Sequence, residues 1–186
     1  MINKHQLEGT GKLRELVLYI CLRSEGDESF GSVKLNKELF FSDFTAYLST
    51  GRAITGHDYQ KLENGPAPRV MKPLLDDMIE RGDLVLATRD YHGYSQKKPL
   101  ALREPDLAEF TGKEIAIVGE ILDQYRHFSA RDISDLSHEF IGWQAVEEGE
   151  TIPYASVLLD SRELSEQDHE WVKTIDTSRI EELLAS

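Results

Sequence analysis

The histidines are the first residues in this sequence that could do chemistry, and their spacing argues against a metal site. There are six, without a recurring interval. The sharpest case is the His-Glu-Phe-Ile-Gly run that begins at His138. A zinc protease helix needs a second histidine four residues after the first, so that both imidazoles face one metal. Gly142 stands at that position. His138 is therefore interpreted as a structural histidine that packs near Trp143, and no metal is expected.

Other patterns that could support catalysis are incomplete. The Gly-Thr-Gly-Lys run at residues 9–12 matches only part of a phosphate-binding loop, because Leu13 follows the lysine and no strand precedes it. Thr10 is expected to cap the first helix instead. Asp76 and Asp77 are adjacent on a predicted helix, so their carboxylates point in different directions. No nucleophile with an orienting base is recognisable. The sequence therefore predicts a protein that is not an enzyme and has no catalytic residue and no cofactor.

Cysteine usage and hydropathy restrict the compartment. The chain of 186 residues has one cysteine, Cys21, at an apolar helical position, so no disulfide framework and no thiol cluster can form. The N-terminal residues have no apolar signal-peptide core, and no stretch approaches 18 apolar residues. A cytoplasmic protein without a membrane span is expected.

Charge is divided unevenly along the chain. Residues 1–103 contain 15 Lys and Arg against 14 Asp and Glu, whereas residues 104–186 contain 6 against 20. The formal net charge of −13 therefore lies almost wholly in the second half. Such a surface repels nucleic acids and membranes and can attract a basic partner. Acidic helices that only keep the protein in solution would have the same composition.

The elements that must position these residues are predicted mainly as helices. Apolar residues recur at helical spacing in five segments before residue 143. These segments are residues 11–23, 35–51, 66–82, 115–125 and 129–142. Gly51 is the predicted C-terminal cap of the second helix, and Pro66 and Pro68 are placed at the start of the third. Ser129 is the predicted N-cap of the fifth helix, and Gly142 is its predicted end. Further helical turns are expected from Ser165, around Trp171, and over 179–186.

One β-hairpin is predicted between the third and fourth helices. Two apolar runs, residues 84–87 and 100–102, lie on either side of a loop that contains Gly93. The resulting fold class is mainly α (α+β), a compact domain of about six helices with one small antiparallel β-hairpin. The order of elements in the N-terminal half is that of a winged helix.

The winged-helix order makes a DNA-binding regulator an alternative function. The hairpin is the most basic stretch of the chain, with Arg89, Lys97, Lys98 and Arg103 and two tyrosines among them. The third helix, which would enter the major groove, has its three cations offset by Asp76, Asp77 and Glu80. Because neutralised phosphates supply most of the affinity for DNA, a helix without net positive charge is a poor reader. Nucleic acid is accordingly disfavoured as a partner.

The connector between the second and third helices is unusually constrained. It contains Gly51, Gly56 and Tyr59, then an Asn-Gly-Pro-Ala-Pro run at residues 64–68. Glycine allows backbone angles that other residues avoid, and proline fixes φ. A long loop held in one shape is expected to present or pack something.

Two separated segments resemble the Panacea domain family, also called the SocA-like antitoxin domain. The first has a Lys-Leu-Asn-Lys start at residues 34–37, an aromatic helix over 40–47, the Gly-Arg-x-Ile-Thr-Gly run at 51–56, Tyr59, and Gly-Pro-x-Pro at 65–68. The second resembles the family's Leu-Ser-x-x-Ser-His-Glu…Trp block through Ser134, Ser137, His138, Glu139 and Trp143, followed by the Ile-Pro-Tyr step at 152–154. The resemblance covers residues 11–160.

The resemblance implies an antitoxin of a toxin–antitoxin system, of the kind found on prophages and other mobile elements. Such a domain neutralises a cognate protein toxin by direct binding and without catalysis. The resemblance covers the antitoxin domain over 11–160, and the remaining residues are predicted as a flexible N-terminal lead over 1–10 and a C-terminal helical appendage over 161–186. A second alternative is an adaptor that delivers its partner to a AAA+ protease, because residues 183–186 are small and apolar.

The residues expected to contact the partner are solvent-facing charges and aromatics around the connector. They are Arg52, His57, Tyr59, Lys61 and Arg69. A structural role in shaping and packing is assigned to Gly65, Pro66, Pro68, His138 and Trp143. The oligomeric state and the identity of the toxin cannot be read from the sequence.

Overall fold

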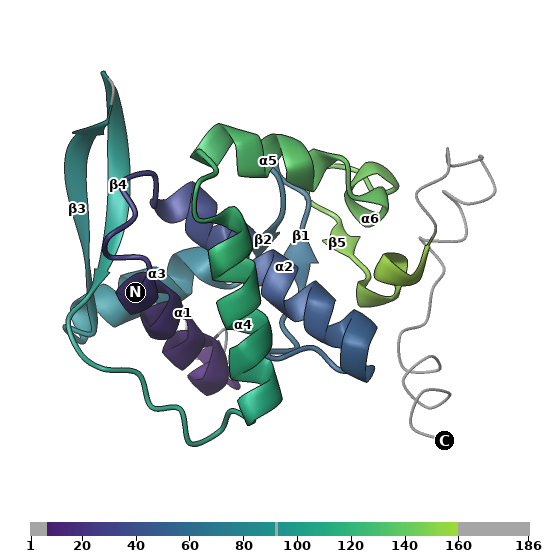
Figure 1. The fold of residues 1–186 in the computed structure, drawn as a ribbon, viewed down its shortest axis with the longest axis horizontal. Helices are drawn as coiled ribbons and strands as arrows, with labels where there is room; N and C mark the ends of the chain where they lie inside the picture. The colour runs from purple at the N-terminus through teal and green to yellow at the C-terminus, as the bar shows by residue number, and fades with distance from the viewer. Residues whose placement is uncertain (1–6, 92, 160–186) are drawn as a thin grey trace.

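The computed structural model describes residues 7–91 and 93–159, which form a mainly helical α+β fold with six α-helices and two small antiparallel sheets (Figure 1). This confirms the predicted fold class. The predicted helical turns after Ser165 and the proposed appendage over 161–186 lie outside the described residues. Within the described ranges, no helix is both long and apolar enough to cross a membrane.

Helix α2 (Ser32–Thr50) is the central element of the fold. It is packed against α1 (Gly11–Arg23), α4 (Gly112–Tyr125), α5 (Ala130–His138) and the 3₁₀ helix η2 (Tyr154–Leu158). Its apolar residues Leu35, Leu39 and Phe40 are fully buried. Because neighbours surround it on several sides, α2 also buries charged side chains, which an amphipathic surface helix would expose. The helix ends at Gly51, whose φ of 76° confirms the predicted C-terminal cap.

Helix α3 (Met71–Glu80) begins later than the sequence suggested. Pro66 and Pro68 were expected at its start, and that expectation is wrong: Ala67–Pro68 forms strand β2. β2 pairs with β1 (Tyr59–Gln60), which pairs on its other edge with β5 (Thr151–Ile152), so the sheet order is β2-β1-β5. Proline is tolerated there because β2 is an edge strand and needs no further donor. This sheet brings residues 59 and 152 together.

The predicted hairpin is present and longer than expected. Strands β3 (Leu84–Tyr91) and β4 (Tyr94–Ala101) pair in register from Leu84 with Ala101 to Tyr91 with Tyr94. The turn contains Gly93, which has a φ of 83°. The hairpin projects at one end of the molecule, and α5 and α6 lie away from it (Figure 1). Only its base, including the fully buried Leu84, contributes to the core.

Capping residues define the helices that follow. Ser129 accepts a hydrogen bond from the Asp132 amide and Asp132 accepts one from the Ser129 amide, so the predicted start of α5 is confirmed as a capping box. The same arrangement between Thr111 and Glu114 starts α4. The predicted fifth helix does not run on to Gly142. It ends at His138, and a separate short helix, α6 (Ile141–Gln144), follows.

The first helix begins without the predicted cap. The Thr10 hydroxyl donates to the Leu7 carbonyl oxygen at 2.8 Å and accepts no hydrogen bond from the helix. Thr10 is nevertheless buried, and Leu7 packs against the main core. Residues 7–10 therefore contact the domain directly.

Candidate functional site

The connector is held by one buried carboxylate on α2. Asp43 is fully buried and accepts hydrogen bonds from the Thr55 amide (2.8 Å), the Thr55 hydroxyl and the Tyr59 hydroxyl (2.8 Å). Burial raises the pKa of Asp43, and these hydrogen bonds partly oppose that rise. Tyr154 closes the cluster by donating to the His57 carbonyl oxygen at 2.7 Å. The shape of the connector therefore depends on a polar network that its own glycines and prolines do not provide.

A second buried charge, Lys34, connects two further segments to α2. Its ammonium nitrogen lies 2.5 Å from Asp27 Oδ2 and 3.0 Å from Ser29 Oγ, both in the loop before α2. It also donates to the carbonyl oxygens of Arg126 and Phe128 in the turn after α4. Four acceptors surround three N–H donors, so this charge is fully compensated.

Lys37, one turn later, is buried with far fewer partners. Its ammonium nitrogen donates to the Pro66 carbonyl oxygen at 3.2 Å, and no carboxylate pairs with it within the described chain. Burial lowers the pKa of Lys37 to about 7. Its side chain passes directly against Gly65, where an added Cβ would lie 2.6 Å from Lys37 Cε and would overlap Ser137 Oγ. Gly65 also has a φ of 89°, so two separate constraints require glycine here.

His138 and Trp143 complete this region by stacking. Their ring centroids are 4.2 Å apart and the rings are inclined by 21°. The Lys61 ammonium lies over the Trp143 ring at 4.1 Å and donates to the Val146 carbonyl oxygen at 2.9 Å. Burial, followed by the nearby charge of Lys37, lowers the pKa of His138. Lys37, Gly65, Ser137, His138 and Trp143, together with Pro66, form what we call the junction, where α2, the connector and the α5–α6 segment meet.

The junction borders an open pocket of about 320 Å³. Asn36 and Lys37 line it from α2, Gly65 lines it from the connector, and Glu63 and Glu148 also line it. Three buried polar atoms here have no hydrogen-bond partner among the described residues: Asn36 Oδ1, His138 Nε2 and Trp143 Nε1. Buried polar groups are normally paired, so three of them without partners distinguish the junction and its pocket from an ordinary packed interface.

The five predicted contact residues occupy different environments. Arg52 and Arg69 are exposed, and His57 and Lys61 are half-buried. Tyr59 was expected to face solvent, and that expectation is wrong: it is 0% exposed, because its ring packs against Phe40 and Phe44.

Two of the five also have internal partners. Arg69 donates to the Gly149 carbonyl oxygen at 2.6 Å and to Thr151 Oγ1 at 3.0 Å, and Lys61 contacts Trp143 and Val146 as described above. Both side chains therefore hold the segment after α6 against the connector. Among the described residues, the side chains of Arg52 and His57 have no hydrogen-bond partner, and Arg52 is the more exposed of the two.

The residues assigned to structure lie where packing requires them. Gly65 and Pro66 in the junction and Pro68 in β2 are buried, and His138 and Trp143 are stacked and half-buried. The sequence reasoning did not identify Lys34, Lys37, Glu38 and Asp43 as buried polar residues. A signal was present: these four charges are interspersed with the apolar residues of one helix, as in a helix surrounded by other elements.

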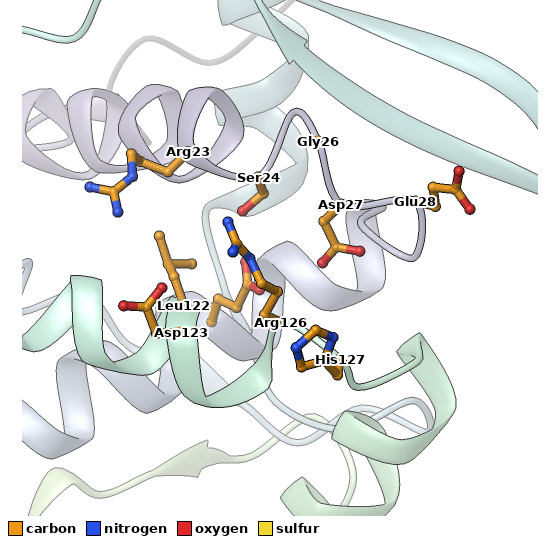
Figure 2. A pocket seen from close by; sticks show the side chains of 10 residues that line it. Arg23, Ser24, Gly26, Asp27, Glu28, Leu122, Asp123, Arg126 and His127 are labelled. Carbon is orange, nitrogen blue, oxygen red and sulfur yellow. The ribbon is translucent and has the colours of Figure 1, made fainter.

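A second, larger pocket lies at the ends of α1 and α4 (Figure 2). Its volume is about 470 Å³, and its walls come from the C-terminal ends of α1 and α4 and from the loop before α2. Glu38 of α2 lines it and is 1% exposed. No sequence motif marked this pocket, because its residues come from three separate segments.

Three of the four cations predicted as a DNA-contacting wing have internal partners. Lys98 is buried and donates to the carbonyl oxygens of Glu25 and Asp27, at 2.8 and 2.9 Å. Arg89 donates to the Glu28 carbonyl oxygen, and Arg103 pairs with Glu15 and Asp83 at 2.7 and 2.6 Å. Of the four basic residues predicted as a DNA-contacting wing, only Lys97 is exposed without a partner among the described residues.

A metal site is not evident in the part of the chain that the structure describes, where no three His, Cys, Asp or Glu side chains are grouped to hold an ion. Cys21 is buried, and its surroundings, mainly burial, raise the pKa of its thiol.

Comparison with known proteins identifies the family. A family model described as "Antitoxin SocA-like, Panacea domain" matches residues 35–144, from α2 through α6. No curated protein and no solved structure matches significantly. The matched range contains every junction residue and Asp43, the buried carboxylate that fixes the connector. The chain belongs to the SocA-like antitoxin family, which is defined by the Panacea domain.

Proposed function

We propose that this protein is an antitoxin that neutralises a cognate protein toxin by binding it directly, without catalysing a reaction. The observation that carries the proposal is the family match over 35–144, the range that contains the connector and the junction. A cytoplasmic location is part of the proposal and is supported by the single, buried cysteine.

The surface beside the junction is suited to a basic protein partner. Asp135, Glu139, Glu147, Glu148 and Glu150 are all exposed on α5 and on the turn after α6. We call these five residues the acidic rim. Opposite potentials increase the rate at which two proteins meet in a productive orientation. We place the toxin contact on the acidic rim and on Arg69, which donates to the Gly149 carbonyl oxygen between Glu148 and Glu150. The exposed Arg52, beyond the C-terminal end of α2, is kept as a further contact candidate.

The direct test is neutralisation of the toxin encoded next to this protein. The adjacent reading frame would be expressed alone and together with this chain, followed by growth measurement and affinity purification. Binding-based neutralisation predicts restored growth and a stable complex at unchanged toxin level. No rescue by this chain would contradict the proposal.

A protease adaptor is the second candidate, and the same strains separate it from direct neutralisation. The residues that suggested it, 183–186, lie outside the described part of the chain. Delivery to a AAA+ protease predicts that the toxin's half-life shortens when the antitoxin is present and recovers in a protease-deficient strain. Direct neutralisation predicts the same toxin half-life in both strains.

The DNA-binding alternative is weakened by the hairpin. Arg89, Lys98 and Arg103 already have carbonyl or carboxylate partners, so using them on phosphates would require breaking those contacts first. Mobility-shift titration of duplex DNA at increasing salt tests this directly. A DNA-binding regulator would bind duplex DNA tightly at low salt, and its affinity would fall steeply as salt increases. For this protein we expect only weak, non-specific binding to DNA.

A further inference from the structure

The pocket between the ends of α1 and α4 contains a carboxyl group that the described chain leaves without a partner. Glu38 lies on the central helix at the inner side of this pocket of about 470 Å³ and is 1% exposed. Its Oε2 is buried and has no hydrogen-bond partner. A carboxyl group removed from water without a compensating donor destabilises the fold, so its presence calls for an explanation.

Neighbouring cations do not compensate this carboxyl group. Lys34 lies one turn earlier on α2, and its four acceptors are Asp27, Ser29 and two carbonyl oxygens of the turn after α4. Its charge lowers the pKa of Glu38 only through space. Asp27 is likewise already paired with Lys34. The donor that would satisfy Glu38 therefore has to come from outside this cluster.

Two arginines stand at the same pocket. Arg23 comes from the end of α1 and Arg126 from the end of α4, and both are exposed (Figure 2). The Arg126 side chain has no partner among the described residues, and Arg23 donates one N–H to Tyr19 at 3.0 Å. Guanidinium groups bind carboxylates and phosphates through paired hydrogen bonds. The pocket thus offers an acceptor at its inner side and anion-binding groups at its edge.

We propose that this pocket binds a small bipolar molecule, with a pair of N–H donors directed at Glu38 and an anionic group held by Arg23 and Arg126. A guanidinium group and the edge of a guanine base both present such a donor pair, and an amino-acid carboxylate or a nucleotide phosphate supplies the anion. The volume falls in the range of small-molecule pockets. The proposal does not depend on the toxin.

The ionisation of Glu38 adds a measurable signature. Burial raises its pKa to about 8, against the opposing effect of Lys34 and with a further contribution from Asp27. The other titratable groups nearby are Cys21 of α1 and the charged or titratable residues that line the pocket: Arg23, Asp27, Glu28, Asp123, Arg126 and His127. At pH 7 the empty site therefore holds a proton, and a ligand with two donors must release it. Heats of binding should differ between buffers of different ionisation enthalpy.

Isothermal titration of the full chain tests the proposal with L-arginine and guanosine 5′-monophosphate as probes. We expect at least one of them to bind with a Kd of about 1 mM or tighter. Binding of L-arginine alone points to an amino-acid ligand, and binding of the nucleotide alone points to a guanine nucleotide. Adenosine 5′-monophosphate lacks the donor pair and should bind at least about tenfold more weakly than the guanine nucleotide.

Variants separate the two halves of the site. Glu38→Gln should raise the Kd of whichever probe binds by about tenfold or more. Arg126→Gln is an exposed change that does not affect the core. It should raise the Kd of guanosine 5′-monophosphate but leave the Kd of guanosine, which has no phosphate, unchanged. Glu109→Gln, an exposed carboxylate outside the pocket, is the control. The proposal is overturned if neither probe binds. It is also overturned if a probe binds wild type and both pocket variants with equal affinity. If Glu38→Gln does not fold, the result with Arg126→Gln decides.

Discussion

Lys34 and Lys37 show how strongly the surroundings of a buried charge decide its role. They lie one turn apart on the same helix and are 0% and 2% exposed. Lys34 has a carboxylate and three other acceptors, whereas Lys37 has one carbonyl oxygen at 3.2 Å. Removing Lys34 would leave Asp27 and two carbonyl oxygens without their donor. Removing Lys37 would leave a single acceptor.

Methionine variants should therefore differ sharply in stability. Lys34→Met should lower the free energy of unfolding by about 3 kcal/mol, because breaking a buried pair leaves a charge without compensation. The free energy of unfolding of Lys37→Met should stay within about 1 kcal/mol of the wild-type value. The variant loses one hydrogen bond, but it no longer has to bury a charged group. Urea unfolding at pH 7 measures both. Equal losses in the two variants would contradict this account.

Glu38 should make stability depend on pH in a defined window. Its pKa rises from 4.5 in the unfolded chain to about 8 in the fold, so between these values the folded state binds the extra proton. Stability contributed by this group is present below pH 4.5 and is lost as the pH rises towards 8.

In Glu38→Gln this dependence should disappear. The variant should gain stability relative to wild type as the pH rises from 5 to 8, by at most about 1.4 kcal/mol for each pH unit. Thermal or urea unfolding across that range provides the measurement. Parallel pH profiles of the two proteins would show that Glu38 is not the group responsible.

At the scale of elements, the connector combines local and long-range constraints. Gly51, Gly56 and Gly65 all have positive φ. The presence of glycine at these positions was enough to predict unusual backbone angles. The contacts that fix the connector were not readable, because they come from Asp43 on the preceding helix and from Thr151–Ile152 far along the chain. The same limit explains why Pro66 and Pro68 were assigned to a helix start. Their local preference fits that position, but pairing with β1 determines the strand.

Two glycines of the connector provide a matched pair of substitutions. Gly56→Ala should cost about 1 kcal/mol, from positive φ alone, because nothing lies within 4 Å of an added Cβ. Gly65→Ala should cost about 3 kcal/mol or more, because the Cβ also meets Lys37 and Ser137. Chemical denaturation of both variants tests the difference. Similar losses would mean that the junction can open to accept a methyl group.

The helices and the hairpin were predictable because their signals lie within their own residues. Apolar spacing, the Ser129–Asp132 capping box and Gly51 define their own elements, and the structure confirms them. The break between α5 and α6 was missed because the apolar spacing continues across it, and Gly142 lies within α6 instead of ending a helix. An added Cβ there would overlap Ser156 Oγ of η2 and lie 2.6 Å from the Phe140 ring, contacts that no local pattern reveals.

At the scale of the whole molecule, the division of charge was visible in the sequence, but its meaning for the hairpin was not. Counting cations predicted a basic wing, whereas the fold uses most of those cations as internal donors. The acidic rim beside the junction contributes five of the exposed carboxylates of the acidic second half. Long-range attraction of a basic toxin would then act mainly on the association rate.

Neutralising part of the acidic rim tests this effect. The triple variant Asp135→Asn, Glu147→Gln and Glu148→Gln should slow toxin association by about threefold or more at low ionic strength, with little change in dissociation. These residues are exposed and do not supply the α5 capping box. Replacing Asp76, Glu80 and Glu109, which lie outside the rim, is the control. Stopped-flow or surface-based kinetics at two salt concentrations would measure both rates, and an unchanged association rate would contradict electrostatic steering.

The order β2-β1-β5 of the small sheet also has a consequence for synthesis on the ribosome. β1 and β2 can pair once residue 68 has emerged, but the other edge of β1 stays open until Thr151–Ile152 arrives. An open strand edge can pair with other chains. At typical translation rates of about 5–20 residues per second, that interval lasts several seconds. A nascent chain therefore completes its connector late, so a toxin made at the same time could meet an antitoxin whose connector sheet is still unfinished.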